Sequence, residues 1–308
     1  MTAFGTGTDE RTAGEKGGET HAGVTNAISF DLEHWYTATL VRDAVTDPTD
    51  HVEESVDRVR ELLDEFDVRA TFFVVGELAR EHPDLIGSLA ADGHEIASHG
   101  HTHTPLFDLD RESFRRELTA SDDAIADAAG VSPVGFRAPN FSIARSTEWA
   151  FDVLEDVGFE YDSSVFPVRT PMYGVGGAPV GPYRSRAPDR FSAGGAGASD
   201  ESTIDELPVA VHPRWRVPVA GGFYARLLPT RVVEWGIRAL NRRGLPAVLY
   251  FHPWEFNPDV RSGEPPLSAR FVSYHNVDST GAKLARLLDR FEFETVAACR
   301  SAHLSNDD

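Results

Sequence analysis

Short apolar segments alternate with amphipathic segments along most of this chain, and this alternation constrains the fold more than any other feature. Residues 24–30, 70–75 and 95–97 have the pattern of buried strands, and apolar side chains recur at helical spacing over 52–66 and 83–92 between them. A strand, helix, strand, helix, strand order requires parallel pairing with right-handed crossovers. The sequence therefore predicts an α/β fold, either a doubly wound sheet or a barrel.

The same alternation continues through the rest of the chain. Helices are expected up to Gly130, from an N-cap at Ser146 to Gly158, and from Thr230 to Gly244, while residues 221–224 are expected to form a turn. Further strands are expected at 134–137, 159–161, 204–209 and 247–251. Roughly seven strand–helix units favour a distorted (β/α) barrel of about seven parallel strands over an open sheet.

The distribution of small and polar residues suggests the domain boundaries. One barrel domain is expected over residues 24–300, after a disordered leader at 1–23 that is rich in Gly, Thr and Glu, and before a tail at 301–308. Periodicity is lost between about 166 and 203, where Gly, Pro, Ser and Ala accumulate. An irregular connection of this length is a lid, a binding loop or a disordered segment.

The charge balance bears on environment and partners. Asp and Glu number 49 against 29 Lys plus Arg, which gives a net charge of -20. Such repulsion is screened at molar salt, where the Debye length falls to about 3 Å, so we expect a halophilic protein. The same charge argues against nucleic acid or an anionic membrane as a partner. The sequence leaves open whether the chain forms a homo-oligomer.

Cysteine content and hydropathy bear on location. The single cysteine, Cys299, excludes an internal disulfide framework, and no apolar run approaches the roughly 18 residues of a membrane span. The first residues show no charged-then-apolar signal pattern. A reducing cytoplasm is therefore the expected location.

Polar clusters follow the predicted strands at the points where the strands end. Asp31 and Glu33 follow the first strand, Arg137 ends the strand at 134–137, and His252 follows the last. The carboxyl ends of parallel strands open onto one face of a barrel, so these side chains are expected to meet there. Solvated clusters would have no reason to share this position, and one common site is the better interpretation. An arginine there can orient a carboxylate by a two-pronged hydrogen bond.

Three alternating histidines directly follow the strand at 95–97. In a turn that runs on into a helix, residues four apart lie on one face, so His99 and His103 could take adjacent positions around a metal ion. His101 would then point elsewhere. A pair at this spacing is also common in solvated loops, and it is the other strand-end clusters that favour a metal site here.

Five motifs taken together resemble a known family. Ser29-Phe30-Asp31-Leu32-Glu33, the histidine segment 98–103, Phe136-Arg137-Ala138-Pro139, Asp162-Ser163-Ser164 and Leu249-Tyr250-Phe251-His252-Pro253 are similar to the ordered motifs of polysaccharide deacetylases with a NodB-homology domain, carbohydrate esterase family 4. The resemblance covers residues from about 25 to 300. The Asp-x-Glu opening and the segments 137–142, 221–229 and 251–255 are most similar to the branch associated with exopolysaccharide loci.

The resemblance implies a role for each matched residue. His99 and His103 would bind a divalent metal ion, and the resemblance implies Zn²⁺. Asp31 would be the base that accepts a proton from metal-bound water, and His252 the acid that protonates the departing amine. Arg137 would orient the base, and Asp162 would help position the acid histidine.

The third metal ligand is less well defined by the motifs. Leu32 stands where many members of the family have a second aspartate, so the ligand would be Glu33. His34 replaces an acid expected in the exopolysaccharide branch, which leaves it open as a ligand. A metal with two imidazoles and one carboxylate keeps an open position for water and polarises the amide carbonyl. Glu255 could keep His252 protonated, and a backbone N–H near Ser163 could stabilise the oxyanion.

The expected function is metal-dependent removal of N-acetyl groups from amino sugars of a polysaccharide. Trp35, Tyr36, Tyr224 and Trp254 are expected as exposed aromatics that stack on an N-acetylated glycan, although structural aromatics are equally common. Two alternatives stay open. One is an amidohydrolase that acts on a small cyclic or ureido amide, and the other is a glycan-binding module with a silent site.

Overall fold

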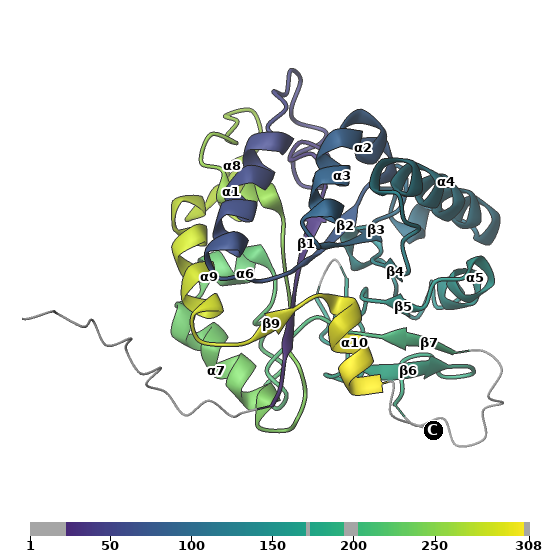
Figure 1. The fold of residues 1–308 in the computed structure, drawn as a ribbon. Helices are drawn as coiled ribbons and strands as arrows, with labels where there is room; N and C mark the ends of the chain where they lie inside the picture. The colour runs from purple at the N-terminus through teal and green to yellow at the C-terminus, as the bar shows by residue number, and fades with distance from the viewer. Residues whose placement is uncertain (1–22, 171–172, 194–202, 305–308) are drawn as a thin grey trace, which may run out of the picture.

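A single curled sheet organises the chain, in a computed structural model that describes residues 23–170, 173–193 and 203–304 (Figure 1). The strand order is β6-β7-β5-β4-β3-β2-β1-β8, and β9 also pairs with β1. The strands are β1 (Asn26–Leu32), β2 (Thr71–Val74), β3 (Glu95–Ser98), β4 (Gly135–Phe136), β5 (Tyr161–Asp162), β6 (Tyr183–Arg186), β7 (Thr203–Glu206), β8 (Val248–Phe251) and β9 (Phe293–Glu294). The predicted α/β class is confirmed.

The sheet is mixed and curls into a half-barrel. Every strand pairing is parallel except that of β6 with β7. After β7 the chain turns towards β8, where Val209 forms an isolated parallel bridge with Val248 and the Ala210 N–H donates to the Val248 carbonyl at 2.9 Å. The curl brings the carboxyl ends of β1, β3, β4 and β8 towards one another, which is the condition for a shared site.

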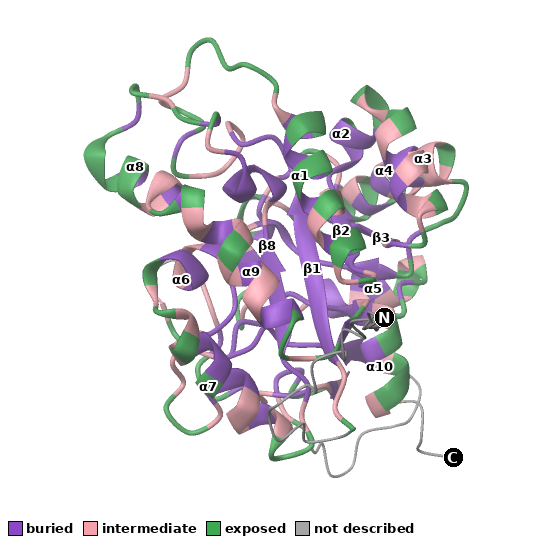
Figure 2. Ribbon diagram, turned by 60° about the vertical axis from the view of Figure 1, so that its left-hand side comes forward, coloured by how far each residue is buried: buried purple, intermediate pink, exposed green. Residues whose placement is uncertain are grey.

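Helices cover the outer face of the sheet. Figure 2 shows β1 and β8 buried beneath helices whose outward sides are exposed. The helices are α1 (Val52–Glu65), α2 (Gly76–Glu81), α3 (Pro83–Ala91), α4 (Arg111–Ala129), α5 (Ala150–Val157), α6 (Gly222–Leu227), α7 (Thr230–Asn241), α8 (Leu267–Tyr274), α9 (Thr280–Leu288) and α10 (Val296–Leu304), with short 3-10 turns between them. No helix in these described ranges is long and apolar enough to cross a membrane.

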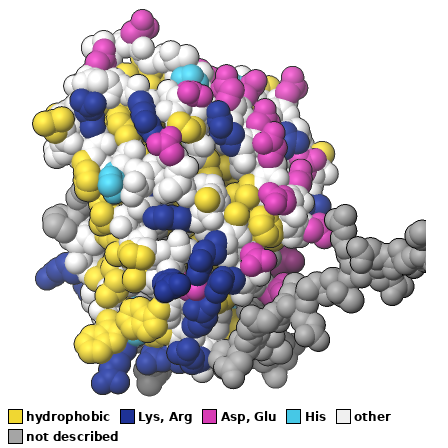
Figure 3. Space-filling model, turned by 90° about the vertical axis from the view of Figure 1, so that its left-hand side faces the viewer, with side chains coloured by type: hydrophobic (Ala, Val, Ile, Leu, Met, Phe, Trp, Pro, Cys, Tyr) yellow, Lys and Arg dark blue, Asp and Glu magenta, His cyan; other side chains and the backbone are white. Residues whose placement is uncertain are grey.

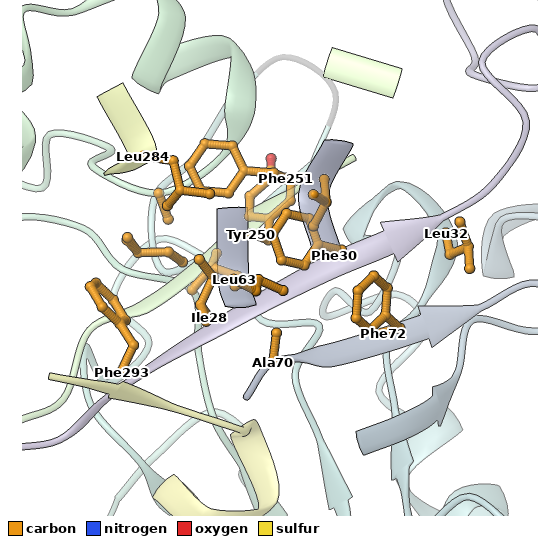
Figure 4. Close-up of a cluster of buried hydrophobic side chains, with 14 of the residues drawn as sticks. Ile28, Phe30, Leu32, Leu63, Ala70, Phe72, Tyr250, Phe251, Leu284 and Phe293 are labelled. Carbon is orange, nitrogen blue, oxygen red and sulfur yellow. The ribbon is translucent and has the colours of Figure 1, made fainter. Parts of the chain in front are cut away.

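The alternation of side chains along β1 separates the core from the site. Ile28, Phe30 and Leu32 point to the outer face, where Phe30 stacks on Phe72 of β2 at 5.3 Å between ring centroids (Figure 4). Burial of each such side chain contributes about 1.5–3 kcal/mol. By the same period of two, Ser29 and Asp31 point into the interior of the half-barrel.

Two segments differ from the expected domain description. Strand β6 lies inside the segment expected to be irregular at 166–203. Its alternation is only four residues long: Tyr183 and Ser185 are buried, and the arginines after each of them are half-buried. So short a pattern does not stand out in the sequence. Helix α10 continues to Leu304, beyond the expected start of the tail, and the Arg184 guanidinium donates to the Leu304 carbonyl at 2.7 Å. The expected leader, apart from Gly23, lies outside the described residues.

Local signals also misplaced two helix starts. Ser146 is not an N-cap, because α5 begins at Ala150 after a turn in which the Thr147 hydroxyl accepts from the Ala144 N–H at 2.9 Å. The segment 221–224 is not a simple turn, because α6 begins at Gly222. Helix α2 was not expected at all, since its six residues are too short for a periodic signal.

Charge is distributed unevenly over the surface. Figure 3 shows Lys and Arg side chains gathered on the lower part of one face and Asp and Glu side chains at its upper right. Part of the basic charge is tied to one acid, since Glu234 of α7 forms ion pairs with Arg238, Arg286 and Arg290 at 3.1, 2.6 and 3.5 Å. The net charge of -20 therefore does not describe every face of the molecule.

Candidate active site

Strand β1 delivers two carboxylates to the interior of the half-barrel. Asp31 is its penultimate residue and Glu33 follows directly, and both are buried, at 3% and 4% exposure. The pleat places them on the same side as Ser29, as expected from the sequence. Two carboxylates with so little solvent require partners, and the partners come from the ends of other strands.

Arg137 is the partner of Asp31. Its fully buried guanidinium donates from Nη1 to Asp31 Oδ1 at 2.6 Å and to the Ser29 hydroxyl at 2.8 Å. Its Nε and Nη2 donate to the Ser163 carbonyl and the Ser163 hydroxyl, both at 2.9 Å, and its Cζ lies 4.0 Å from the Phe73 ring centroid. These contacts fix the guanidinium and leave Asp31 Oδ2 without a contact to Arg137.

The histidine segment forms a turn and not the start of a helix. Gly100 and His103 have φ of 76° and 56°, and this left-handed backbone brings the rings of His99 and His103 to 5.2 Å between centroids. The N–H groups of Gly76 and Glu77 at the start of α2 hold the turn through the carbonyls of Gly100 and His101, at 2.9 and 3.0 Å. The expected meeting of the two histidines occurs, but the turn and not helical spacing causes it.

The two neighbouring imidazoles differ from His101 in their surroundings. His99 Nδ1 lies 2.7 Å from the Arg137 carbonyl, which requires a proton on Nδ1 and leaves Nε2 as the free nitrogen. Burial lowers the pKa of His99 to about 4, so the ring is neutral at pH 7. His101 points away, as expected, and its Nε2 lies 3.1 Å from Arg80.

Glu33 lies between two imidazoles. Its Oε2 is 2.9 Å from His103 Nε2, and its Oε1 is 3.4 Å from His252 Nε2. Burial by itself raises the pKa of Glu33, but the imidazoles, His103 first, outweigh it and lower the pKa to about 2. His34 does not share these contacts, because its Nε2 is 2.7 Å from Glu81.

His252 is held by a second carboxylate. Its Nδ1 is 3.3 Å from Glu255 Oε2, and the same oxygen accepts from the His252 backbone N–H at 2.9 Å. Burial lowers the pKa of His252, but Glu255 chiefly, with Glu33 and Asp31, raises it to about 9. His252 is therefore an imidazolium at pH 7, which is the state that can donate a proton.

The residue that anchors Glu255 is Arg226, which received no role from the sequence. Arg226 Nη2 donates to Glu255 Oε1 at 2.7 Å and to the Val272 carbonyl at 3.0 Å, and Nη1 donates to the His275 carbonyl at 2.9 Å. Both partners are 2% exposed. Arg226 lies in the segment 221–229, which resembles the exopolysaccharide-associated branch, but the resemblance implied no role for this arginine.

Two expected contacts are absent among the described residues. Asp162 does not contact His252, because the β5–β7 register places it opposite Glu206, and its carboxylate accepts from the Ser164 N–H and hydroxyl. Burial raises the pKa of both Asp162 and Glu206, which favours a proton shared between them. The Ser163 N–H is not free for an oxyanion, because it donates to the Phe136 carbonyl at 2.9 Å.

The aromatic residues expected at the surface are mostly buried. Trp35 and Trp254 are 7% and 8% exposed and pack in one apolar cluster, and Trp254 stacks on the His252 ring at 5.0 Å between centroids. Tyr36 and Tyr224 are half-buried. The two tryptophans line a small pocket together with Glu33, so they border the site without offering a free surface.

The side chains of His99, His103 and Glu33 are of the types that bind a divalent cation, but two of them are in direct contact with each other. His99, His103 and Glu33 supply two imidazoles and one carboxylate, and the Arg137 carbonyl sets the tautomer of His99 as in many metal sites. The direct contact of Glu33 with His103 occupies the space between them. Among the described residues, a different group has all its ligand atoms within 4.8 Å of one another, namely His34, Glu81 and His82.

Two family models together match most of the chain. Residues 43–161 match the model described as polysaccharide deacetylase. Residues 163–300 match a domain of unknown function, DUF3473. The boundary between the two matches falls at the end of β5, so Arg137 and the histidine turn lie in the first region and His252 in the second.

Curated relatives match about a third of the chain. A chitooligosaccharide deacetylase from Rhizobium leguminosarum bv. trifolii is 37% identical over 97 residues, which are 32% of this chain and 42% of the relative. A peptidoglycan-N-acetylglucosamine deacetylase from Bacillus cereus is 28% identical over 122 residues, 36% of this chain and 44% of the relative. The match thus spans less than half the length of these relatives.

Solved structures match the fold over nearly the whole chain. A candidate polysaccharide deacetylase from Mycobacterium smegmatis has a TM-score of 0.59 at 24% identity, over 91% of this chain and 90% of that one. The PuuE allantoinase has a TM-score of 0.60 at 15% identity, over 96% and 95%. At these identities the likeness is one of fold.

Proposed function

We propose that this chain, whose residues 43–161 match the polysaccharide deacetylase model, removes N-acetyl groups from amino sugars of a polysaccharide. The observation that carries the proposal is one buried site in which an arginine-held carboxylate, Asp31, and a protonated imidazole, His252, lie around Glu33. Hydrolysis of an amide needs a base for the attacking water and an acid for the departing amine, and these two residues supply them.

The site would hold a divalent cation, Zn²⁺ in our proposal. His99, His103 and Glu33 are the residues that would bind it, and it would supply Lewis acidity towards the acetyl carbonyl. The Nδ1–H contact of His99 with the Arg137 carbonyl already orients its Nε2 as a ligand. A cation there would replace the direct contact between Glu33 and His103.

Asp31 acts as the base. Its Oδ1 is held by Arg137, while Oδ2 makes no contact with that guanidinium and can accept the proton of the attacking water. Arg137 keeps the carboxylate oriented, because its other donors are fixed by Ser29 and Ser163. The base therefore needs little rearrangement before reaction, which favours proton transfer.

His252 acts as the acid. Its Nε2 faces the site, at 3.4 Å from Glu33, while its Nδ1 is held by Glu255. The raised pKa of about 9 keeps the proton on the ring at neutral pH until the amine leaves. Free amino sugar and acetate are the products.

The substrate class follows from the relatives. The named activities of the two curated relatives are on chitooligosaccharide and on N-acetylglucosamine of peptidoglycan. We therefore propose an oligomer or polymer that contains N-acetylated glucosamine. A small cyclic or ureido amide is the second candidate, because the buried Trp35 and Trp254 narrow the space next to Glu33.

The test is acetate release from N-acetylglucosamine oligomers in molar KCl, together with metal content. Wild type should release acetate, and His99→Ala should lose both acetate release and one equivalent of metal. His101→Ala is the matched control, because His101 belongs to the same turn but contacts Arg80. Bound metal without acetate release would favour the small amide, and a chain without metal or turnover would be a glycan-binding module.

A further inference from the structure

A second cluster of ligand-type side chains lies next to the active site, where the chain leaves β1. His34, Glu81 and His82 have ligand atoms that all lie within 4.8 Å of one another. His34 follows Glu33 directly, while Glu81 ends α2 and His82 precedes α3. Two segments far apart in the sequence, the end of β1 and the junction of α2 with α3, thus place imidazole and carboxylate groups together.

Two further carboxylates border this cluster. Asp50 Oδ2 is 3.0 Å from His82 Nε2, and Glu53 Oε1 is 3.4 Å from His82 Nδ1. With neutral imidazoles the group of five side chains carries three negative charges and no positive one. The three carboxylates repel one another, and a cation bound between them would be attracted to all three.

His34 carries an unsatisfied nitrogen in the cluster. The residue is 9% exposed, and its Nδ1 has no hydrogen-bond partner in the described part of the chain. The nearest acid oxygen is Asp50 Oδ1, at 3.6 Å, which exceeds a hydrogen-bond distance. Its other nitrogen is 2.7 Å from Glu81 Oε2, and the ring stacks on Tyr36 at 4.8 Å between centroids. A buried nitrogen aimed at a carboxylate without bonding to it is the feature that points to a ligand.

The cluster has a buried base and an open rim. The side chains of His34 and His82 are 11% and 16% exposed, whereas those of Asp50 and Glu81 are 44% and 58% exposed. A cation could therefore enter from solvent without any rearrangement of the core. Imidazole nitrogen with carboxylate oxygen suits a borderline divalent metal such as Zn²⁺ or Co²⁺ better than Mg²⁺ or Ca²⁺.

We propose that His34, Glu81 and His82, with Asp50, form a second divalent-cation site that is separate from the one assigned to Glu33, His99 and His103. The separation is seen in the contacts, because Glu33 contacts His103 and His252 while His34 contacts Glu81 and Asp50. A cation here joins the end of β1, the segment before α1 and the junction of α2 with α3. The inference does not depend on the proposed deacetylase activity.

The experiment counts metal ions on the full chain in molar KCl. The chain is freed of metal by a chelator and titrated with Co²⁺, with bound metal followed by calorimetry and by visible absorption. Wild type should bind two equivalents, and His82→Ala and His103→Ala should each bind one. The double variant should bind none. Glu77→Gln is the matched control, since Glu77 is an exposed acid on the same helix α2 and should leave two equivalents.

His34 separates this site from the active site. His34→Ala and His82→Ala should remove the same equivalent, so that combining them removes no more than either alone. If His34 were instead the third active-site ligand, His34→Ala combined with His82→Ala would lose two equivalents of Co²⁺, and His34→Ala combined with His103→Ala would lose only one. That result would overturn the proposal.

Folding and activity controls keep the outcomes distinct. Far-UV circular dichroism of each variant must match wild type, and Glu81→Gln provides a milder change if His82→Ala unfolds. Equal Co²⁺ binding by wild type, Glu81→Gln and His82→Ala would disprove the second site. A chain that releases no acetate but loses one Co²⁺ in His82→Ala would disprove the proposed function and leave this inference standing.

Discussion

Two buried arginine–carboxylate pairs border the site, and they differ in what the carboxylate contacts. Arg137 holds Asp31 at 2.6 Å, and Arg226 holds Glu255 at 2.7 Å, with every partner 3% exposed or less. In the proposed mechanism Asp31 is itself the base. Glu255 lies behind His252 and acts through it.

In the proposed mechanism the same kind of arginine–carboxylate pair would support a base in one place and an acid in the other. Arg137 orients a carboxylate that is left with a free oxygen for a proton. Against the effect of burial, Glu255, which Arg226 holds in place, raises the pKa of the neighbouring His252 imidazole to about 9, so that the proton stays on the ring. The arginine in each case offsets the cost of burying the carboxylate.

The largest expected effect is on rate, and it separates the two carboxylates. Asp31→Asn should lower acetate release by about 10²–10⁴-fold, because the general base is lost. Glu255→Gln at pH 7 should cost less than about tenfold, because the neutral amide keeps a hydrogen bond to His252. Steady-state kinetics with metal content as a control checks both. Equal losses would mean that Glu255 also acts directly.

Removal of either arginine tests whether the pairs also hold the fold. Arg137→Met and Arg226→Met should each lower the free energy of unfolding by about 3–5 kcal/mol, since each leaves a buried carboxylate unpaired. Urea unfolding measures the effect. Arg226→Met combined with Glu255→Leu should recover much of the loss. Arg286→Met is the surface control and should cost at most about 1 kcal/mol, because Arg238 and Arg290 still pair with Glu234.

A pH titration separates the proposed role of His252 from that of Asp31. The pKa of His252 rises from 6.5 to about 9 on folding, so its contribution to stability is fully present below pH 6.5 and is lost as pH rises through about 9. The melting temperature of wild type should therefore fall over this range. Glu255→Gln should flatten that fall and move the alkaline limb of kcat/KM to lower pH. An unchanged limb would remove His252 as the acid.

The smallest effect is expected at the second contact of Arg137. Ser163→Ala removes a hydroxyl that accepts from Arg137 Nη2 and donates to the Leu207 carbonyl, both buried. The loss should be about 0.5–1.5 kcal/mol in thermal unfolding, with little change in rate. A loss as large as that of Arg137→Met would show that Ser163, and not Asp31, dominates the environment of Arg137.

Much of the part of the site around Asp31 and Arg137 could be predicted from the sequence. Asp31 and Arg137 both end apolar strands, and parallel strands place such residues at one edge, so their meeting required only the order of strands and helices. The meeting of His99 and His103 was also expected, although the reason was wrong. Positive φ at Gly100 and His103 makes the turn, and no helical period indicates it.

The contacts around His252 and Glu255 could be identified only from the tertiary structure. Glu255 is three residues from His252 and could be suspected, but Arg226 lies 29 residues away from Glu255 on a short helix that no periodicity marks. Gly222 of that helix allows the approach, because a Cβ there would collide with the Glu255 carboxylate. The partner of Asp162 also needed the tertiary structure, because the β5–β7 register places it opposite Glu206.

The sequence by itself determined the α/β class, the inward side of β1 and the chemical types present in the site, because side-chain period and strand order are local properties. Only the tertiary structure decided which groups pair. Contacts such as Arg226 with Glu255, Asp162 with Glu206, and His34 with Glu81 depend on how the sheet curls and on strand register, and neither is encoded in any short segment of the chain.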